Sequence, residues 1–168
     1  FLTNFYKKIY KNKMDKLKFL NLNEAEISKI SINAYVTMKI SFSNMISQIS
    51  DNIENINASK ILNTIGSDER VGKKYLSLGA KFAGPCFPRD NLNLIKFLKK
   101  NKSAYALPAA TDNVNNKQLQ RYIELFKKVK TKINGKIVVG ICGLSYKDNT
   151  NLNTKSPGLM LFNKLKKK

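Results

Sequence analysis

The residues best suited to chemistry lie between Ser67 and Asp90, where Cys86 follows a Phe-Ala-Gly-Pro turn. Asp90 stands four residues after this thiol, and Arg70 and Arg89 are two of the chain's three arginines. A cysteine at a bend in the backbone, with cations and a carboxylate nearby, is typical of a reactive thiolate. We therefore predict a nucleophilic thiol at Cys86.

Lys29 and Asn33 form a second candidate pair. They are four residues apart, so they share one face if the surrounding stretch is helical. Aimed at an interior, they could both donate hydrogen bonds to a substrate oxygen. Spacing alone favours the simpler interpretation, a solvated surface lysine.

The chain contains no histidine, which excludes a Ser-His-Asp or Cys-His catalytic pair and a His-ligated zinc site. Its two cysteines cannot form a Cys-only metal site, and we predict no metal. Their wide spacing does not indicate a disulfide framework. We expect a reducing, cytoplasmic setting and an inert, buried Cys142.

The formal charge of +20 raises the possibility of a basic helical module that binds RNA or another polyanion. Only three of the 31 cations are arginine, and the lysines are scattered among many Asn and Ile residues. This pattern favours a compositional bias, and we expect no nucleic-acid partner. No apolar run reaches the roughly 20 residues of a membrane span, so we expect no membrane association.

The first half of the chain predicts helices. Residues 1–20 place apolar side chains at helical spacing, and a break is expected at 21–23. Residues 24–50 fit both a strand alternation and a helical repeat. The absence of Gly and Pro from Glu24 to Ile65 favours one long helix.

The middle of the chain predicts shorter elements. A helix is expected at 58–65 and a helical turn at 68–75. A loop at 76–88 then leads to a helix that has Pro88 in its first turn and ends at Lys100. Residues 101–111, with Pro108, are expected to form a connector. The next helix is predicted from Asp112, its candidate cap, to about residue 131.

The pattern changes after Asn134-Gly135. Residues 136–142 are short, apolar and β-branched, which predicts a buried strand, and a polar loop follows at 143–150. Ser156-Pro157 opens a last predicted helix. Strand, loop and helix in this order are typical of a nucleotide-binding α/β unit. One such unit cannot bury its own sheet, so we expect the chain to stop inside a domain.

Together, these segments resemble the UDP-glucose/GDP-mannose dehydrogenase family. Residues 25–34 and 40–44 resemble its long central helix, and Asp68-Glu-Arg-Val-Gly72 resembles its Asp-x-Arg-Ile-Gly element. Residues 82–90, FAGPCFPRD, resemble its Phe-Gly-Gly-x-Cys-Phe-Pro-Lys-Asp active-site segment. Gly143 to Lys147 and Ser156-Pro157 resemble the beginning of its third domain.

The resemblance implies a mostly α-helical fold in three parts. Residues 1–22 would be the last helix of a truncated NAD-binding Rossmann domain. Residues 23–132 would form the multi-helical central dimerisation domain with its long helix, and residues 24–50 would make a homodimer. Residues 133–168 would be the first strand, loop and helix of an α/β UDP-binding domain. No GxGxxG motif is present, so we expect these 168 residues to be inactive by themselves.

The implied reaction is a four-electron, NAD-dependent oxidation of a nucleotide sugar from alcohol to carboxylate. Cys86 would be the nucleophile and would form a thiohemiacetal and then a thioester. Lys29 and Asn33 would stabilise the oxyanion, and Asp90 would assist proton transfer or activate water. The implied nicotinamide-binding residues are Cys86, Phe87, Pro88 and Arg89. The implied substrate-binding residues are Arg70, which acts across a subunit interface, and Tyr75, Ser77, Gly79, Phe82, Ala83, Gly84, Tyr146 and Lys147.

The chain departs from the family pattern at several positions. Lys81 and Ala83 replace small residues of a glycine-rich loop, which predicts backbone strain there. Thr154-Lys155 replace an Arg-Glu pair that contacts the cofactor. UDP-glucose is the first substrate hypothesis, ahead of UDP-N-acetylmannosamine and GDP-mannose. A catalytically decayed dimerisation remnant stays open as an alternative.

Overall fold

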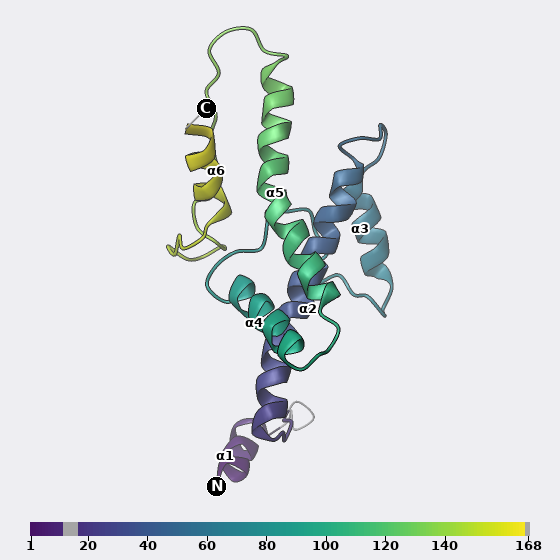
Figure 1. Ribbon diagram of the computed structural model, residues 1–168, viewed down its shortest axis with the longest axis vertical. Helices are drawn as coiled ribbons and strands as arrows, with labels where there is room; N and C mark the ends of the chain where they lie inside the picture. The colour runs from purple at the N-terminus through teal and green to yellow at the C-terminus, as the bar shows by residue number, and fades with distance from the viewer. Residues whose placement is uncertain (12–16, 167–168) are drawn as a thin grey trace.

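The computed structural model describes residues 1–11 and 17–166, and these contain six helices and no strand (Figure 1). The molecule is elongated. The longest helix, α2, runs through the middle, with α3, α4 and α5 packed against it. α6 packs on α5. The helices are α1 (Leu2–Ile9), α2 (Leu22–Ile49), α3 (Ala58–Ser67), α4 (Phe87–Lys100), α5 (Ala106–Lys130) and α6 (Pro157–Lys166).

The long helix predicted for residues 24–50 is confirmed as α2. It begins with a capping box, in which the Asn21 side chain accepts from the Glu24 N–H at 2.9 Å. The Glu24 carboxylate accepts from the Asn21 N–H at 2.8 Å. This pair satisfies two free N–H groups of the first turn. Residues 21–23, predicted as a break, are therefore the start of the helix.

The two faces of α2 have an unusual chemistry. Its buried residues are small or polar: Ala34, Thr37, Ser41, Ser43, Asn44 and Ser47. Several of its large apolar side chains are exposed instead, among them Ile32, Tyr35, Phe42, Met45 and Ile49.

The start of α4 was predicted correctly and the start of α5 was not. α4 has Pro88 in its first turn and ends at Lys100, as predicted. The prediction that residues 101–111 form a connector is wrong for its second half, because α5 begins at Ala106. Pro108 lies in the first turn, where its missing N–H breaks no helical hydrogen bond. Asp112 is consequently inside α5 and does not cap it.

The remaining helices differ from the predictions mainly in length. α3 extends two residues past the predicted end, and a turn closed by the Asp68 carbonyl follows it. α1 ends at Ile9, so the predicted helix over 1–20 is too long. Residues 12–16 of that prediction lie outside the described residues. No helix in the described ranges is long and apolar enough to cross a membrane.

The C-terminal part contains α6 and a long irregular segment before it. The Ser156 hydroxyl accepts from the Leu159 N–H at 3.3 Å and so caps the predicted last helix. Residues 136–142 adopt no regular structure. A strand requires a hydrogen-bonded partner, and no strand lies beside this run among the described residues. The strand therefore stays a prediction.

Candidate functional site

The side chains of Lys29, Asn33 and Asp90 meet where α2 packs on α4. The Lys29 ammonium donates to Asp90 Oδ2, and the Asn33 amide donates to the same oxygen at 2.6 Å. Arg89 Nε donates to the other oxygen at 3.1 Å. Asp90 is only 2% exposed, whereas the Lys29 side chain is 58% exposed. Lys29 is therefore more than a solvated lysine, since it joins two helices.

The environment keeps Asp90 ionised. Burial alone would raise its pKa, but the hydrogen bonds from Lys29, Asn33 and Arg89, with the charge of Lys29, outweigh burial. Together they hold the pKa of Asp90 below its ordinary value of 3.8. At neutral pH the residue is an acceptor, with two cations and an amide arranged around it.

Cys86 lies one turn before Asp90, immediately before the first residue of α4. The Asp90 N–H donates to the Cys86 carbonyl at 2.8 Å. The thiol is free and exposed, and it faces a cleft of about 1090 Å³. It stands at the N-cap of α4, where the free N–H groups of the first turn point towards the cleft end of the helix.

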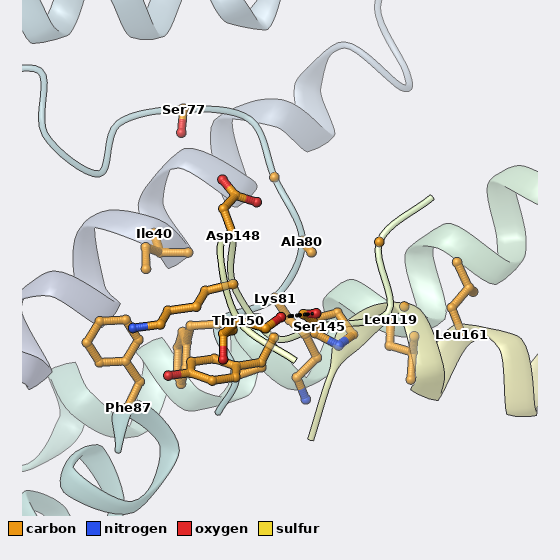
Figure 2. A pocket seen from close by; sticks show the side chains of 18 of the residues that line it. Ile40, Ser77, Ala80, Lys81, Phe87, Leu119, Ser145, Asp148, Thr150 and Leu161 are labelled. Carbon is orange, nitrogen blue, oxygen red and sulfur yellow. Dashed lines mark hydrogen bonds between the residues drawn. The ribbon is translucent and has the colours of Figure 1, made fainter. Parts of the chain in front are cut away.

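The cleft is bounded by the loop before α4, the start of α4 and the segment before α6. In Figure 2, Ser77 and Ala80 mark the loop, Phe87 the start of α4, and Leu119 and Leu161 the far side. The Ser145 hydroxyl donates to the Thr150 carbonyl at 2.5 Å and closes the turn that carries Asp148. Nine of the predicted substrate- and cofactor-binding residues line the cleft: Tyr75, Ser77, Gly79, Phe82, Ala83, Cys86, Phe87, Tyr146 and Lys147.

Gly84 lies in close contact with the ring of Tyr146. Its φ of +76° belongs to the left-handed region, and a Cβ there would lie 2.5 Å from the Tyr146 ring. Only glycine allows the ring of Tyr146 to pack this closely on the loop. Gly84 therefore brings the loop together with the segment that contains Tyr146.

Arg70 lies apart from this cleft. Its guanidinium is paired with the neighbouring carboxylate of Asp68 at 2.6 Å, and its side chain is 88% exposed. Among the described residues, its side chain makes hydrogen bonds and an ion pair with Asp68 and with none of the other predicted site residues. Pro88 and Arg89 also do not line the cleft, although Arg89 contacts Asp90.

The strain predicted at Lys81 and Ala83 is absent, because both have an ordinary negative φ. Positive φ occurs instead at Gly84 and at Tyr75 (φ +64°), which lies on the cleft. The Lys81 ammonium contacts the Asn116 side-chain oxygen at 3.4 Å. Burial lowers its pKa, with Asp112 opposing the shift and Lys155 adding to it.

Cys142 differs from its prediction. It was expected to be an inert core residue, but it is exposed and also lines the cleft. The reason is that residues 136–142 are not buried by a sheet among the described residues.

Sequence analysis missed a group of polar side chains that hold the cleft loop: Asn44, Asn115, Gln118 and Tyr122. It also missed the ion pair of Asp51 with Arg121, which joins the end of α2 to α5. All six are ordinary polar, charged or aromatic residues, five of them on helices and Asp51 in the turn after α2. Only their buried or half-buried positions, which depend on packing, distinguish them.

Residues 23–117 match the model of the UDP-glucose/GDP-mannose dehydrogenase family, central domain. The UDP-glucose 6-dehydrogenase TuaD of Bacillus subtilis is 33% identical over 139 residues, which are 83% of this chain and 30% of the relative. A UDP-glucose 6-dehydrogenase of Rhizobium meliloti is 30% identical over 98% of this chain and 37% of the relative.

A solved structure has the same fold. The UDP-glucose dehydrogenase of Pyrobaculum islandicum superposes with a TM-score of 0.84 and 28% identity, over 98% of this chain and 38% of that protein. The chain thus spans about a third of the length of the relatives it matches. The matched range covers nearly all of α2, the thiol segment and the first part of α5, and it includes the cluster around Asp90. The chain belongs to the UDP-glucose/GDP-mannose dehydrogenase family.

Proposed function

We propose that this chain is the central part of an NAD-dependent nucleotide-sugar 6-dehydrogenase that oxidises the sugar C6 alcohol to a carboxylate. One observation carries the proposal. An exposed thiol faces a cleft one helical turn from a buried carboxylate, which Lys29 and Asn33 hold from a different helix. Such a convergence of nucleophile, cation and carboxylate is typical of covalent catalysis.

Cys86 is the proposed nucleophile. Its thiolate adds to the carbon of the C6 aldehyde, and the new C–S bond gives a thiohemiacetal. The aldehyde itself would come from loss of a hydride from the C6 alcohol to a first NAD. Loss of a second hydride, from the thiohemiacetal carbon to a second NAD, would leave a thioester. Water then adds to the thioester carbonyl and the C–S bond breaks, which releases the carboxylate and the thiolate. A thiol suits both steps because it adds readily to carbonyls and leaves readily from thioesters.

Lys29 and Asn33 are the proposed oxyanion donors. Their donor groups are already directed at a common oxygen, Asp90 Oδ2, so little reorganisation is needed to stabilise a negative oxygen nearby. Asp90, whose lowered pKa keeps it ionised, accepts a hydrogen bond from the attacking water and orients it.

The residues around Cys86 fit one end of NAD. Cys86 and Arg89 are exposed, and Phe87 and Pro88 are half-buried beside them, so an apolar edge and a cation border the thiol. Bound NAD supplies a hydride acceptor. No glycine-rich pyrophosphate loop occurs in the 168 residues, so we assign Cys86 to Arg89 to the nicotinamide end alone.

The cleft is the proposed nucleotide-sugar site, with UDP-glucose as the first substrate. Its walls supply the ring of Tyr146 and the cation of Lys147, whose Nζ lies 5.6 Å from that ring's centroid. An aromatic face and a cation suit a base and a phosphate. The named relatives are UDP-glucose 6-dehydrogenases, which supports the uridine nucleotide. Both cysteines are free, in keeping with a cytoplasmic enzyme.

We also propose a homodimer through the exposed apolar face of α2. Tyr35, Phe42 and Ile49 recur every seven residues on this face, with Met45 between them, and all four are exposed. A partner there would bury these side chains and could bring its own Arg70 to the substrate. Phe42→Glu is expected to give monomers by sedimentation velocity, and an unchanged sedimentation coefficient would rule this face out.

NAD reduction with UDP-glucose tests the proposed function in the protein expressed from its complete reading frame. Cys86→Ser is expected to abolish turnover, because a hydroxyl neither adds to nor leaves the carbonyl carbon as a thiolate does. Cys142→Ser is the matched control, since it removes the other exposed thiol. Equal losses in both variants, or full activity of Cys86→Ser, would refute the assignment.

A further inference from the structure

The loop of residues 77–84, which forms one wall of the cleft, contains no helix or strand. Its backbone is held instead by side chains from α2 and α5. Figure 2 shows Ser77 and Ala80 on this loop, along the upper edge of the cleft. The shape of the wall therefore depends on side chains of these two helices, of which Tyr122 also lines the cleft, and not on hydrogen bonds within the loop.

Five hydrogen bonds hold three residues of the loop: Gly79, Ala80 and Phe82. Gln118 Nε2 donates to the Gly79 carbonyl at 3.1 Å, and the Tyr122 hydroxyl donates to the same oxygen at 2.7 Å. Asn44 Nδ2 donates to the Ala80 carbonyl at 3.3 Å. Asn115 accepts from the Phe82 N–H at 2.7 Å and donates to the Phe82 carbonyl at 3.1 Å.

The amides that make these contacts are in unfavourable surroundings. Asn44 and Gln118 are 0% exposed and Asn115 is 2% exposed. The side-chain oxygens of Asn44 and Gln118 are buried and have no partner among the described residues. A buried acceptor without a donor costs stability, and an apolar side chain of the same shape would avoid that cost. Asn44 and Gln118 therefore contribute little to the stability of the core, and their role is to hold the loop.

We infer that Asn44, Asn115, Gln118 and Tyr122 are positioning residues that fix the backbone of residues 79–82 as the wall of the ligand cleft. They act through the loop and do not touch the reacting atoms. That the ligand is a nucleotide sugar rests on the proposed function. That these side chains hold the loop rests on the hydrogen bonds alone.

The test removes both donors to the Gly79 carbonyl without changing side-chain shape. Gln118→Met with Tyr122→Phe deletes these bonds and also deletes the orphan oxygen of Gln118, so thermal stability is expected to be kept. Gly79 is exposed, and water can hydrate its freed carbonyl. Gln120→Met is the matched control, because Gln120 lies on the same helix, is exposed and donates only to Glu124.

Two measurements test the opening of the loop and ligand binding in the cleft separately. Trypsin cleavage after Lys81, followed by mass spectrometry, reports opening of the loop. We expect it to be at least about fivefold faster in the double variant, the change that one lost hydrogen bond produces. Cleavage after Lys96 in α4 is expected to stay unchanged. The KM for UDP-glucose is expected to rise by at least about fivefold, with kcat nearly unchanged.

Unchanged cleavage after Lys81 would overturn the inference, and so would faster cleavage with an unchanged KM. Asn44→Leu, which deletes the bond to Ala80 from α2, provides an independent second variant with the same expectations. If the unsubstituted protein does not turn over UDP-glucose, the proposed function fails. Cleavage after Lys81 then decides the loop-holding role alone, faster cleavage supporting it and unchanged cleavage refuting it.

Discussion

Two carboxylates tie α2 to neighbouring helices, and they do so in different ways. Asp90 of α4 is 2% exposed and accepts from Lys29, Asn33 and Arg89, two of which are largely exposed cations. Asp51, just after the end of α2, is 18% exposed and pairs with an Arg121 that is 14% exposed.

In the second pair, Asp51 and Arg121 satisfy each other's hydrogen-bonding groups. Arg121 binds both oxygens of Asp51 and adds contacts to the Ser47 carbonyl and hydroxyl at 3.1 and 2.9 Å. Lys29, by contrast, keeps much of its surface free beside a buried carboxylate. A half-exposed cation beside a buried anion can still donate to a ligand, whereas a mutually satisfied pair stabilises the fold.

The largest expected effect is on kcat, which should depend on Asp90 but not on Asp51. Asp90→Asn is expected to lower kcat for UDP-glucose oxidation by about 10²- to 10⁴-fold, the range for loss of a proton-transfer group. Asp51→Asn, the matched change at the other pair, is expected to leave kcat unchanged. Similar losses in both variants would remove the distinction between a functional and a structural pair.

The next effect concerns stability. Arg121→Met is expected to lower the free energy of unfolding by about 2 kcal/mol, because a half-buried Asp51 loses its charged donor. Urea denaturation measures this change. Arg70→Met is the control, since the Arg70–Asp68 pair is exposed and is expected to contribute nothing measurable. A loss at Arg70 as large as that at Arg121 would contradict the role given to burial.

The smallest effect is a dependence of stability on pH. The hydrogen bond from Arg121 lowers the pKa of Asp51 despite opposing burial, and the pKa of Asp90 is also lowered. A carboxyl with a lowered folded-state pKa stabilises the protein above its unfolded pKa of about 3.9, and this stability disappears as the pH falls towards the folded value. Unfolding free energy is therefore expected to fall between about pH 5 and pH 3.

The two variants sharpen this expectation. Asp51→Asn and Asp90→Asn should each make the acid-induced decrease shallower, because each removes one group that binds a proton on unfolding. Urea titrations at fixed pH values provide the measurement. If the unfolding free energy of a variant falls as steeply with pH as that of the unsubstituted protein, the carboxylate removed does not contribute to the pH dependence.

Several features followed from the sequence because their causes are local. The absence of Gly and Pro from Glu24 to Ile65 and the helical repeat determined the long α2, and Pro88 determined where α4 starts. Cys86 was predicted in the loop before this helix and Asp90 near its start, and the structure has Cys86 as the N-cap and Asp90 in the first turn. The identity of the thiol segment was equally visible, since it depends on residue types in a fixed order.

Other features were decided only by the tertiary structure, because they depend on what lies opposite each residue. Spacing left Lys29 as a surface lysine, and only the packing of α4 on α2 gave it Asp90 as a partner. The start of α5 was missed because Pro108 fits a first turn as well as a connector. Asn44 and Gln118 carry no local signal at all. Burial against a loop some 40 residues away in sequence makes them matter, and no local pattern encodes a contact over that separation.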